Sequence, residues 1–187
     1  MNIEIIKENL KSRVSEKRYI HSENVAKTAA FLAKIYGADE FNACLSGWLH
    51  DISKELTLEE MQSLAKDLDL DNEVKTSRAL LHGPAGAEYA KKNYDISEDV
   101  YNACFYHTFG RCGMSLLEKI VFVSDMTETG RDFEGVDALR ELSKNDIDKA
   151  VIACINQTLS FLISQNRTIY AKTVETRNFY LKHMEKF

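Results

Sequence analysis

The sequence predicts an all-α fold, a bundle of about nine or ten helices, from three observations. Proline occurs once and glycine only eight times in 187 residues, whereas strand-rich folds usually need more turn residues. Apolar residues recur at helical spacing along most of the chain. The β-branched stretch "KIVFVSD" at 119–125 has strand propensity but no second strand to pair with, so we expect it to form a buried helix.

The first helices are indicated by amphipathic patterns. "MNIEIIKENLKSRV" at the N-terminus has acids early in an amphipathic pattern, unlike a basic segment followed by an apolar run, as in a signal peptide. The first long helix is expected over 15–37, and Gly37 is its natural C-terminal stop. The apolar residues that share one face of this helix are Ile20, Val25, Ala29, Leu32, Ala33 and Tyr36. A second helix is expected over roughly residues 39–51.

Capping residues mark the starts of three later helices. Thr57 and Glu60 form a capping box, as do Ser115 and Glu118 before the buried "KIVFVSD" helix. Ser97 is a suitable N-cap for "EDVYNACFYHT". These signals place helix starts next to residues 58, 98 and 116.

The rest of the chain continues the helical pattern in one unit. Pro84 is expected in a first helical turn, where its missing N–H is harmless. Two further amphipathic helices are expected near 143–164 and 168–185. Because no linker, repeat or low-complexity tract interrupts the chain, we expect residues 1–187 to form a single domain.

Composition narrows the possible partners and location. The chain is 44% hydrophobic and 28% charged, which is typical of a globular protein. A net charge of −5 argues against sequence-independent binding of duplex nucleic acid. No run of about 18 apolar residues suggests a membrane span. The cysteines show no CxxC spacing, so we expect reduced thiols and a cytoplasmic protein; they are Cys44, Cys104, Cys112 and Cys154.

A cluster of histidines and carboxylates is the strongest chemical signal. In "SGWLHDISKELTLEEM", His50 and Asp51 end an apolar run, and burying both groups is costly unless each finds a partner. Asp125 likewise follows an apolar helix. A metal ion satisfies such a set, and imidazole with carboxylate suits iron, manganese or zinc rather than calcium. The histidines that complete the candidate cluster are His21, His82 and His107.

These residues resemble the H…HD…D signature of the HD-domain superfamily of metal-dependent phosphohydrolases. Within it the motifs "RYIHSENVAKTA", "GWLHDISK", "LLHGPAGA", "YHTFGRCGMSLLEKIVFVSD" and "GRDF" resemble those of the YqeK-type symmetrical bis(5'-nucleosyl)-tetraphosphatases. The resemblance covers most of the chain and implies a single HD-type domain, an HD-domain helical bundle, over 1–187 with core motifs at about 18–133.

The resemblance also implies a cofactor and a reaction. A metal would be held by His21, His50, Asp51 and Asp125, with iron as the cofactor and manganese or another divalent metal as a substitute. The reaction would be hydrolysis of diadenosine tetraphosphate to two ADP by a metal-bound hydroxide.

Further residues are assigned roles around that metal. Lys54 lies one helical turn after the His-Asp pair and is expected to bind phosphate if the helix continues. His82 and His107 are expected to act on the leaving phosphate as general acids or to bind a second metal. Arg131 suits bidentate phosphate binding. Together with Asp51 as a catalytic residue, the expected contacts to substrate are His21, Lys54, His82, His107, Thr108, Asp125 and Arg131.

Several alternatives stay open. A related HD phosphohydrolase acting on mononucleotides would carry the same metal ligands, and a nucleotide-binding protein without turnover is a third hypothesis. Phe105, Tyr106 and Phe109 flank His107 and could stack on a nucleobase, although aromatic residues at helical spacing more often form core. Arg111 could bind phosphate or lie on the surface, and His183 is expected to be exposed. The expected partner is a dinucleoside polyphosphate with an ADP-like product, and a homodimer is possible.

Overall fold

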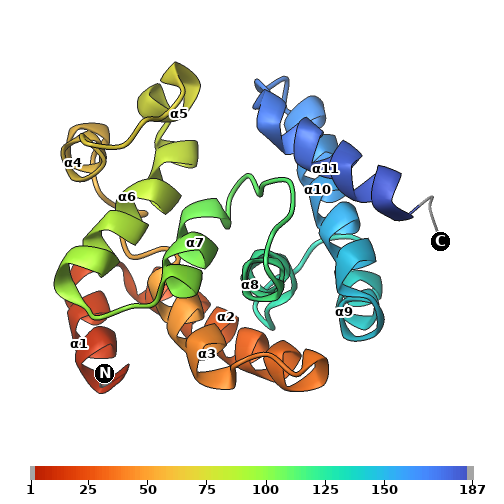
Figure 1. Ribbon diagram of the computed structural model, residues 1–187, viewed down its shortest axis with the longest axis horizontal. Helices are drawn as coiled ribbons and strands as arrows, with labels where there is room; N and C mark the ends of the chain where they lie inside the picture. The colour runs from red at the N-terminus through yellow and green to blue at the C-terminus, as the bar shows by residue number, and fades with distance from the viewer. Residues whose placement is uncertain (1–2, 185–187) are drawn as a thin grey trace.

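The structure is a computed structural model that describes residues 3–184, and this part of the chain folds as eleven α-helices without a strand (Figure 1). Ten of the helices have seven or more residues, which confirms the all-α prediction; the eleventh, α5, is a five-residue helix that the sequence did not indicate. The helices are α1 (Ile3–Arg13), α2 (Glu16–Tyr36), α3 (Glu40–Leu49), α4 (Leu58–Leu64), α5 (Asn72–Thr76), α6 (Arg78–Asn93), α7 (Glu98–Tyr106), α8 (Leu116–Thr127), α9 (Val136–Asn145), α10 (Ile147–Ser164) and α11 (Ala171–Met184).

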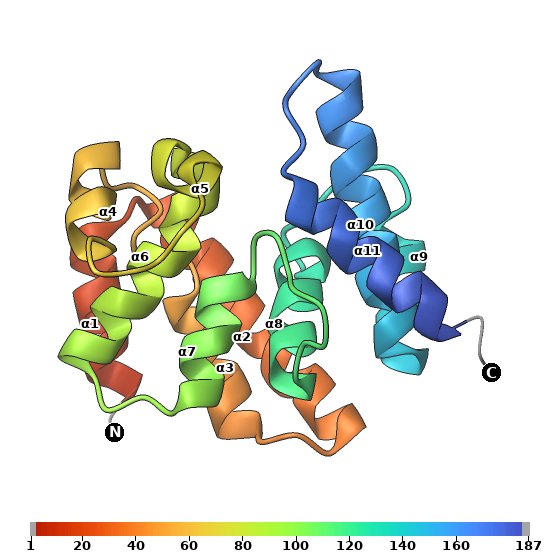
Figure 2. The same cartoon turned by 45° about the horizontal axis from the view of Figure 1, so that its top comes forward.

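Helix α8 lies at the centre of the molecule. It packs against α2, α3 and α7 on one side and against α9 and α10 on the other (Figures 1 and 2). Its residues Ile120, Val121 and Val123 are completely buried. This explains why "KIVFVSD" is apolar nearly all round, because a helix enclosed by others has no face for solvent. The prediction of a buried helix here is confirmed.

Helix ends that depend on local hydrogen bonds lie where the sequence predicts them. Both capping boxes are present, with the Thr57 and Ser115 side chains accepting from the N3 backbone N–H and the N3 glutamates bonding back. The Ser97 hydroxyl accepts from the backbone N–H of Val100. Gly37 ends α2 in the left-handed conformation, with φ of 69°, which glycine adopts without strain.

Three predicted details are wrong, and at Asp146 the reason is a local cap rather than packing. Pro84 lies inside α6 and not in its first turn, and it leaves the Leu80 carbonyl without the usual N–H donor. The helix expected over 143–164 is divided at Asp146, which caps α10 after α9 has ended. Ile20, placed on the buried face of α2, is 48% exposed.

Two further boundaries differ by a few residues. The helix expected over 39–51 is α3, which ends at Leu49, so His50 caps it and Asp51 lies in the turn beyond. The last expected helix is α11, and residue 185 of its predicted range lies outside the described residues. The end of α3 is the more important difference, because it places the His-Asp pair at a helix end that points into the molecule.

Helix α10 is the most apolar of the long helices. Among the described residues it alone is long and apolar enough to span a membrane by length and composition, with a mean hydropathy of 1.2 over Ile147–Ser164. Core helices of globular folds pass the same test. In this structure α10 packs against α8, α9 and α11, and these contacts account for its apolar face.

Candidate metal and phosphate site

Six of the expected site residues meet at one buried place. They come from helices that are far apart in the sequence: α2, the end of α3, α6, the end of α7 and α8. Subsets of three have ligand atoms that all lie within 4.8 Å of one another, which is the spacing that a single metal ion needs. The six residues are His21, His50, Asp51, His82, His107 and Asp125.

Two of the imidazoles are oriented by the carbonyl groups of their own helix ends. The Nδ1 atom of His50 lies 2.7 Å from the Gly47 carbonyl, and that of His107 lies 2.7 Å from the Cys104 carbonyl. A carbonyl only accepts, so each Nδ1 carries the proton and donates it. Each Nε2 then faces the cluster, which is the orientation that metal-binding histidines adopt.

The Nε2 atoms of four histidines lie close together. The Nε2 atoms of His21 and His50 are 3.3 Å apart, and those of His82 and His107 are 2.9 Å apart. On the outer side of the cluster, His21 Nδ1 lies 3.2 Å from the buried carboxylate of Glu128, which suits a donated proton there. Lone pairs that face each other at such distances repel. A cation or a shared proton between them removes that repulsion, so the geometry favours a metal ion.

Asp51 is buried between the two histidine pairs. Its Oδ2 atom lies 3.5 Å from His50 Nε2 and 2.6 Å from an Arg18 nitrogen, whereas Oδ1 lies 3.2 Å from His82 Nε2. Burial alone would raise the pKa of Asp51, but His50 and Lys54 outweigh it and hold the pKa well below its usual range. The carboxylate is therefore ionised, and its buried Oδ1 accepts no hydrogen bond of good geometry from the described residues.

Asp125 completes the cluster from α8. One of its oxygens lies 3.1 Å from His21 Nε2 and 2.5 Å from a guanidinium nitrogen of Arg131. Its side chain is 21% exposed, so this side of the cluster opens to solvent. Burial opposes ionisation, yet the hydrogen bond to His21 and the charge of Arg131 hold the pKa of Asp125 well below its usual range.

Lys54 and Thr108 lie beside His82. Lys54 Nζ is 2.9 Å and Thr108 Oγ1 is 3.1 Å from His82 Nε2. The helix does not continue from α3 to Lys54 as expected; a turn in which the Lys54 N–H bonds to the Asp51 carbonyl brings the side chain there instead. Burial and the neighbouring Lys54 lower the pKa of His82 to about 4, so this imidazole is neutral at pH 7.

Sequence reasoning missed two residues of the site, Arg18 and Glu128. Arg18 precedes His21 by one turn of α2 and pairs with Asp51 at 2.6 Å. Glu128 follows Asp125 by three residues and bonds His21. The signal that could have found both is their i,i+3 spacing from a proposed ligand, which places them on the same face.

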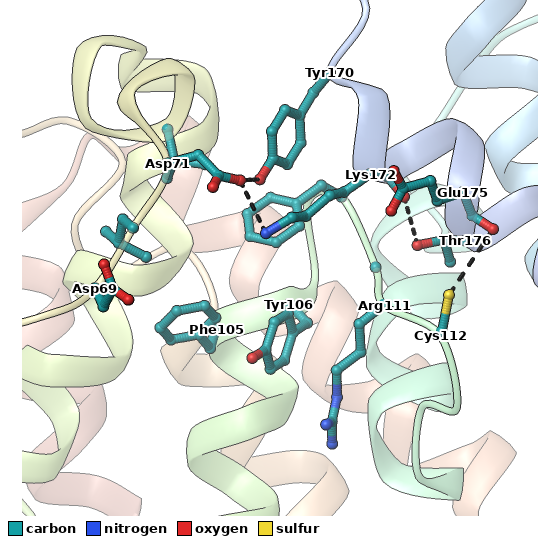
Figure 3. A pocket seen from close by; sticks show the side chains of 14 residues that line it. Asp69, Asp71, Phe105, Tyr106, Arg111, Cys112, Tyr170, Lys172, Glu175 and Thr176 are labelled. Carbon is teal, nitrogen blue, oxygen red and sulfur yellow. Dashed lines mark hydrogen bonds and ion pairs between the residues drawn. The ribbon is translucent and has the colours of Figure 1, made fainter.

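A cavity of about 240 Å³ lies at the end of α7, along the segment that carries His107 and Thr108, although none of the six cluster residues lines it (Figure 3). Tyr106 and Phe109, which flank His107 and Thr108 in the sequence, line one wall, and Tyr170 and Lys172 reach over from the start of α11. Tyr170 and Lys172 both bond the Asp71 carboxylate, at 2.5 and 2.9 Å. The aromatic residues therefore both pack together and form a cavity wall.

Other candidate residues lie elsewhere. Arg111 makes two 2.7 Å hydrogen bonds to the carboxylate of Glu118, so its guanidinium is already engaged. His183 is exposed on α11, as expected. The four cysteines are free thiols; Cys104 and Cys154 are buried, Cys44 is half-buried and Cys112 is exposed.

Comparisons with known proteins agree with this geometry. The HD domain family matches residues 18–130. A protein of Staphylococcus aureus named symmetrical bis(5'-nucleosyl)-tetraphosphatase is 39% identical over 184 residues, covering 96% of this chain and 95% of the relative. A protein of Halalkalibacterium halodurans with the same name is 40% identical over 171 residues, covering 90% and 91%.

A solved structure shows the same fold. It comes from Clostridium acetobutylicum, is described as a predicted HD superfamily hydrolase involved in NAD metabolism, and is 38% identical to this chain with a TM-score of 0.94. The match covers 98% of both chains. Motifs, geometry and relatives agree, and the chain belongs to the HD-domain family.

Proposed function

We propose that this protein is a symmetrical bis(5'-nucleosyl)-tetraphosphatase, which hydrolyses diadenosine tetraphosphate to two ADP with a bound metal ion. The relatives named for this reaction are about 40% identical to it over most of the chain. The observation that supports it from the structure is the convergence of four imidazole Nε2 atoms on the ionised, buried Asp51. Water suffices as the nucleophile, so no covalent intermediate is needed.

The metal ligands in this proposal are His21, His50, Asp51 and Asp125. Their nitrogen and oxygen donors fit iron, with manganese as a substitute, better than calcium. When bound, the metal supplies Lewis-acid stabilisation of phosphate charge and makes water acidic. Arg18 and Glu128 position two of these ligands: Arg18 fixes the Asp51 carboxylate and Glu128 fixes the His21 ring.

Residues on either side of the cluster are assigned to the phosphates. Arg131, 35% exposed and fixed by Asp125, can donate its free N–H groups to a phosphate oxygen. Thr108 offers a hydroxyl from the other side. Because His82 is neutral at pH 7, the nearby Lys54 ammonium is the better group to stabilise charge on the leaving phosphate. His107 keeps its proton on Nδ1 and so acts through Nε2.

One nucleoside half is assigned to the aromatic cavity beside His107. Tyr106, Phe109 and Tyr170 provide flat apolar walls, and the cavity of about 240 Å³ is bounded by the Asp71–Lys172 pair. A nucleobase suits such walls because stacking on aromatic rings is favourable for any base. The stacking role considered for Tyr106 and Phe109 is therefore part of the proposal.

Product analysis tests this function. Purified protein loaded with iron or manganese is incubated with diadenosine tetraphosphate, and the nucleotides are separated by chromatography. ADP as sole product is expected. AMP with ATP would mean that a different phosphorus is attacked, and no turnover by metal-loaded protein would favour the mononucleotide-directed alternative, tested with a nucleotide panel. The homodimer and the cytoplasmic location stay predictions of the sequence.

A further inference from the structure

A second cavity is lined by two residues that contact the cluster, Arg18 and Lys54. It has a volume of about 480 Å³, is open to solvent, and is lined by residues of α2, of the turn after α3 and of the start of α6. We call it the basic groove; its residues are Arg18, Lys54, Glu55, Arg78 and Ala79. None of these five side chains is aromatic, in contrast to the cavity beside His107.

The basic groove is continuous with the proposed metal site, because two of its cations contact the cluster directly. Arg18 bonds Asp51 at 2.6 Å, and Lys54 lies 2.9 Å from His82 Nε2. A ligand that extends from the metal past Lys54 therefore enters the groove. Arg78 is the groove cation for which the described residues show no contact with a proposed metal ligand.

The charged groups that line the groove favour the binding of an anion. Three cations line it in a chain whose net charge is −5. Its one acid, Glu55, is engaged by Ser15, whose backbone N–H and hydroxyl bond the two carboxylate oxygens at 2.7 and 2.6 Å. Arg18 and Lys54 both face the Asp51 carboxylate, at 2.6 and 3.6 Å, so among the described residues Arg78 is the groove cation whose charge is not paired with a carboxylate. Helix α6 begins here at Arg78 without a side-chain cap, which adds its positive end to the same wall.

Arg78 is fixed by one hydrogen bond, and its other N–H donors remain available to a ligand. Its Nη2 donates to the Leu56 carbonyl at 2.8 Å. An arginine has five N–H donors, and within residues 3–184 we find no carboxylate paired with this one. The side chain is exposed, so the other donors are accessible to a ligand in the groove.

We propose that the basic groove binds the second nucleoside diphosphate half of the substrate, with Arg78 as a substrate-binding residue that determines specificity for dinucleotides. The inference rests on the proposed function: a substrate with two identical halves needs an acceptor for each half, on either side of the reacting phosphorus. The aromatic cavity takes one half, and the groove takes the other. Because the groove offers cationic side chains and no aromatic ring, it recognises the phosphates of this half and not its base.

The binding of ADP tests this proposal without turnover. Metal-loaded protein is titrated with ADP in a calorimeter, and two ADP molecules are expected to bind per chain. Arg78→Ala is expected to weaken one of the two sites about tenfold and to leave the other within twofold. Lys75→Ala is the matched control, since it removes an exposed cation three residues earlier that does not line the groove, and it should leave both sites unchanged.

Kinetics give an independent readout on the same variants. Arg78→Ala is expected to raise the KM for diadenosine tetraphosphate about tenfold with kcat within twofold, whereas Arg78→Lys recovers part of the loss. A wild type that saturates with one ADP, or an Arg78→Ala variant that binds both ADP molecules normally or both weakly, overturns the groove assignment. The proposed function fails separately, on the products formed by the wild type.

Discussion

At the scale of single residues, Asp51 connects the two halves of the cluster. Its Oδ2 faces His50 and Arg18, and its Oδ1 faces His82, at distances of 3.5, 2.6 and 3.2 Å. An asparagine at position 51 would have the same shape but would place an NH₂ group where Asp51 has a negatively charged oxygen. The cations and imidazoles around Asp51 would then lose the negative charge that they face, so no neutral residue is expected to replace Asp51.

Asp51→Asn is therefore expected to abolish metal binding and turnover together. Loss of a residue that merely supports a ligand costs about 10–100-fold in metal affinity, so loss of a ligand should exceed about 100-fold. The metal-to-protein ratio by elemental analysis and the rate of ADP formation measure the two effects. Asp95→Asn, which removes an exposed acid between α6 and α7, is the control; a D51N protein that keeps metal and activity would exclude Asp51 as a ligand.

The free thiols are predicted to differ sharply in reactivity. Burial raises the pKa of Cys104 and Cys154, so these groups stay neutral while a normal thiol ionises near pH 9. The thiolate is the reactive form, and Cys112 is exposed. At pH 8.5 a thiol reagent should label Cys112 rapidly and the two buried thiols at least about a hundredfold more slowly, at a rate limited by opening.

Mass spectrometry of digested, labelled protein identifies the labelled cysteines. Labelling in urea gives the total number of thiols that can react when the protein is unfolded. Raising the pH from 7 to 8.5 should not accelerate the labelling of Cys104, because the raised pKa keeps its thiolate population negligible over that range. Equally fast labelling of all three cysteines in the native protein would contradict the buried positions.

The sequence predicted the residues that meet in the cluster, because histidines and acids beside apolar runs need polar partners or a metal once they are buried. It could not predict their distances, nor the parts played by Arg18 and Glu128. Charged residues on a helix usually face solvent, and only the packing of α2 against the turn after α3 turns Arg18 toward Asp51. The neutral state of His82 also depends on burial that no local pattern contains.

At the scale of the helices, ends determined by local hydrogen bonds were predictable and ends determined by packing were not. The capping boxes at Thr57 and Ser115 satisfy N–H groups within one turn, so their sequence signal is sufficient. Pro84 is tolerated inside α6 because its surroundings are buried and fixed by neighbouring helices. Asp146 interrupts a continuous apolar pattern because its side chain caps α10 by accepting from Lys149.

The contact between α2 and α3 is the element-scale feature that positions the metal ligands. Gly47 of α3 lies against the backbone of α2, where an added Cβ would come within 2.4 Å of Ala26 Cα. Backbone atoms cannot move aside without shifting the whole helix. Gly47→Ala is expected to lower the free energy of unfolding by about 1–3 kcal/mol and to weaken metal binding, since His21 and His50 lie on these two helices.

Urea denaturation and metal titration measure both effects. Gly86→Ala serves as the control, because it also adds a Cβ inside a helix but meets side-chain atoms of Ser53 and Ile52 at 3.3 and 3.4 Å and no backbone atom closer than 3.6 Å. There the gain in helix propensity, about 1 kcal/mol, offsets the tight contact. If Gly47→Ala were as stable as Gly86→Ala, the close approach of α2 and α3 would be excluded as a determinant of the site.

At the scale of the whole molecule, charge is distributed unevenly. The chain is acidic overall, yet Arg18, Lys54 and Arg78 gather in the basic groove. Net charge does not predict the local field at the site, which depends on where the helices place their cations. The same arrangement would attract a polyphosphate to the basic groove.

We propose that residues 1–187 act as one domain, because one apolar core connects nearly all the helices. This core contains buried residues of α1, α2, α3 and α6–α11. A smaller cluster under α4 and α5 holds Met61 and Val74 and is joined to α11 by Tyr170. Phe105 packs against both clusters, so neither can lose its packing without exposing apolar area of the other.

The expected consequence is a single cooperative unfolding transition. In urea, with chelator present so that metal release does not add a second step, far-UV circular dichroism should report all helices and Trp48 fluorescence should report the main core. Trp48 is buried in α3, so the two curves should coincide if α4 and α5 unfold with the rest. An earlier loss of helix signal, with Trp48 still buried, would mean that the smaller cluster opens on its own. In that case Tyr170 and Asp71, which form one wall of the aromatic cavity, would unfold separately from the main core. Substrate binding would then weaken before the metal cluster is disturbed.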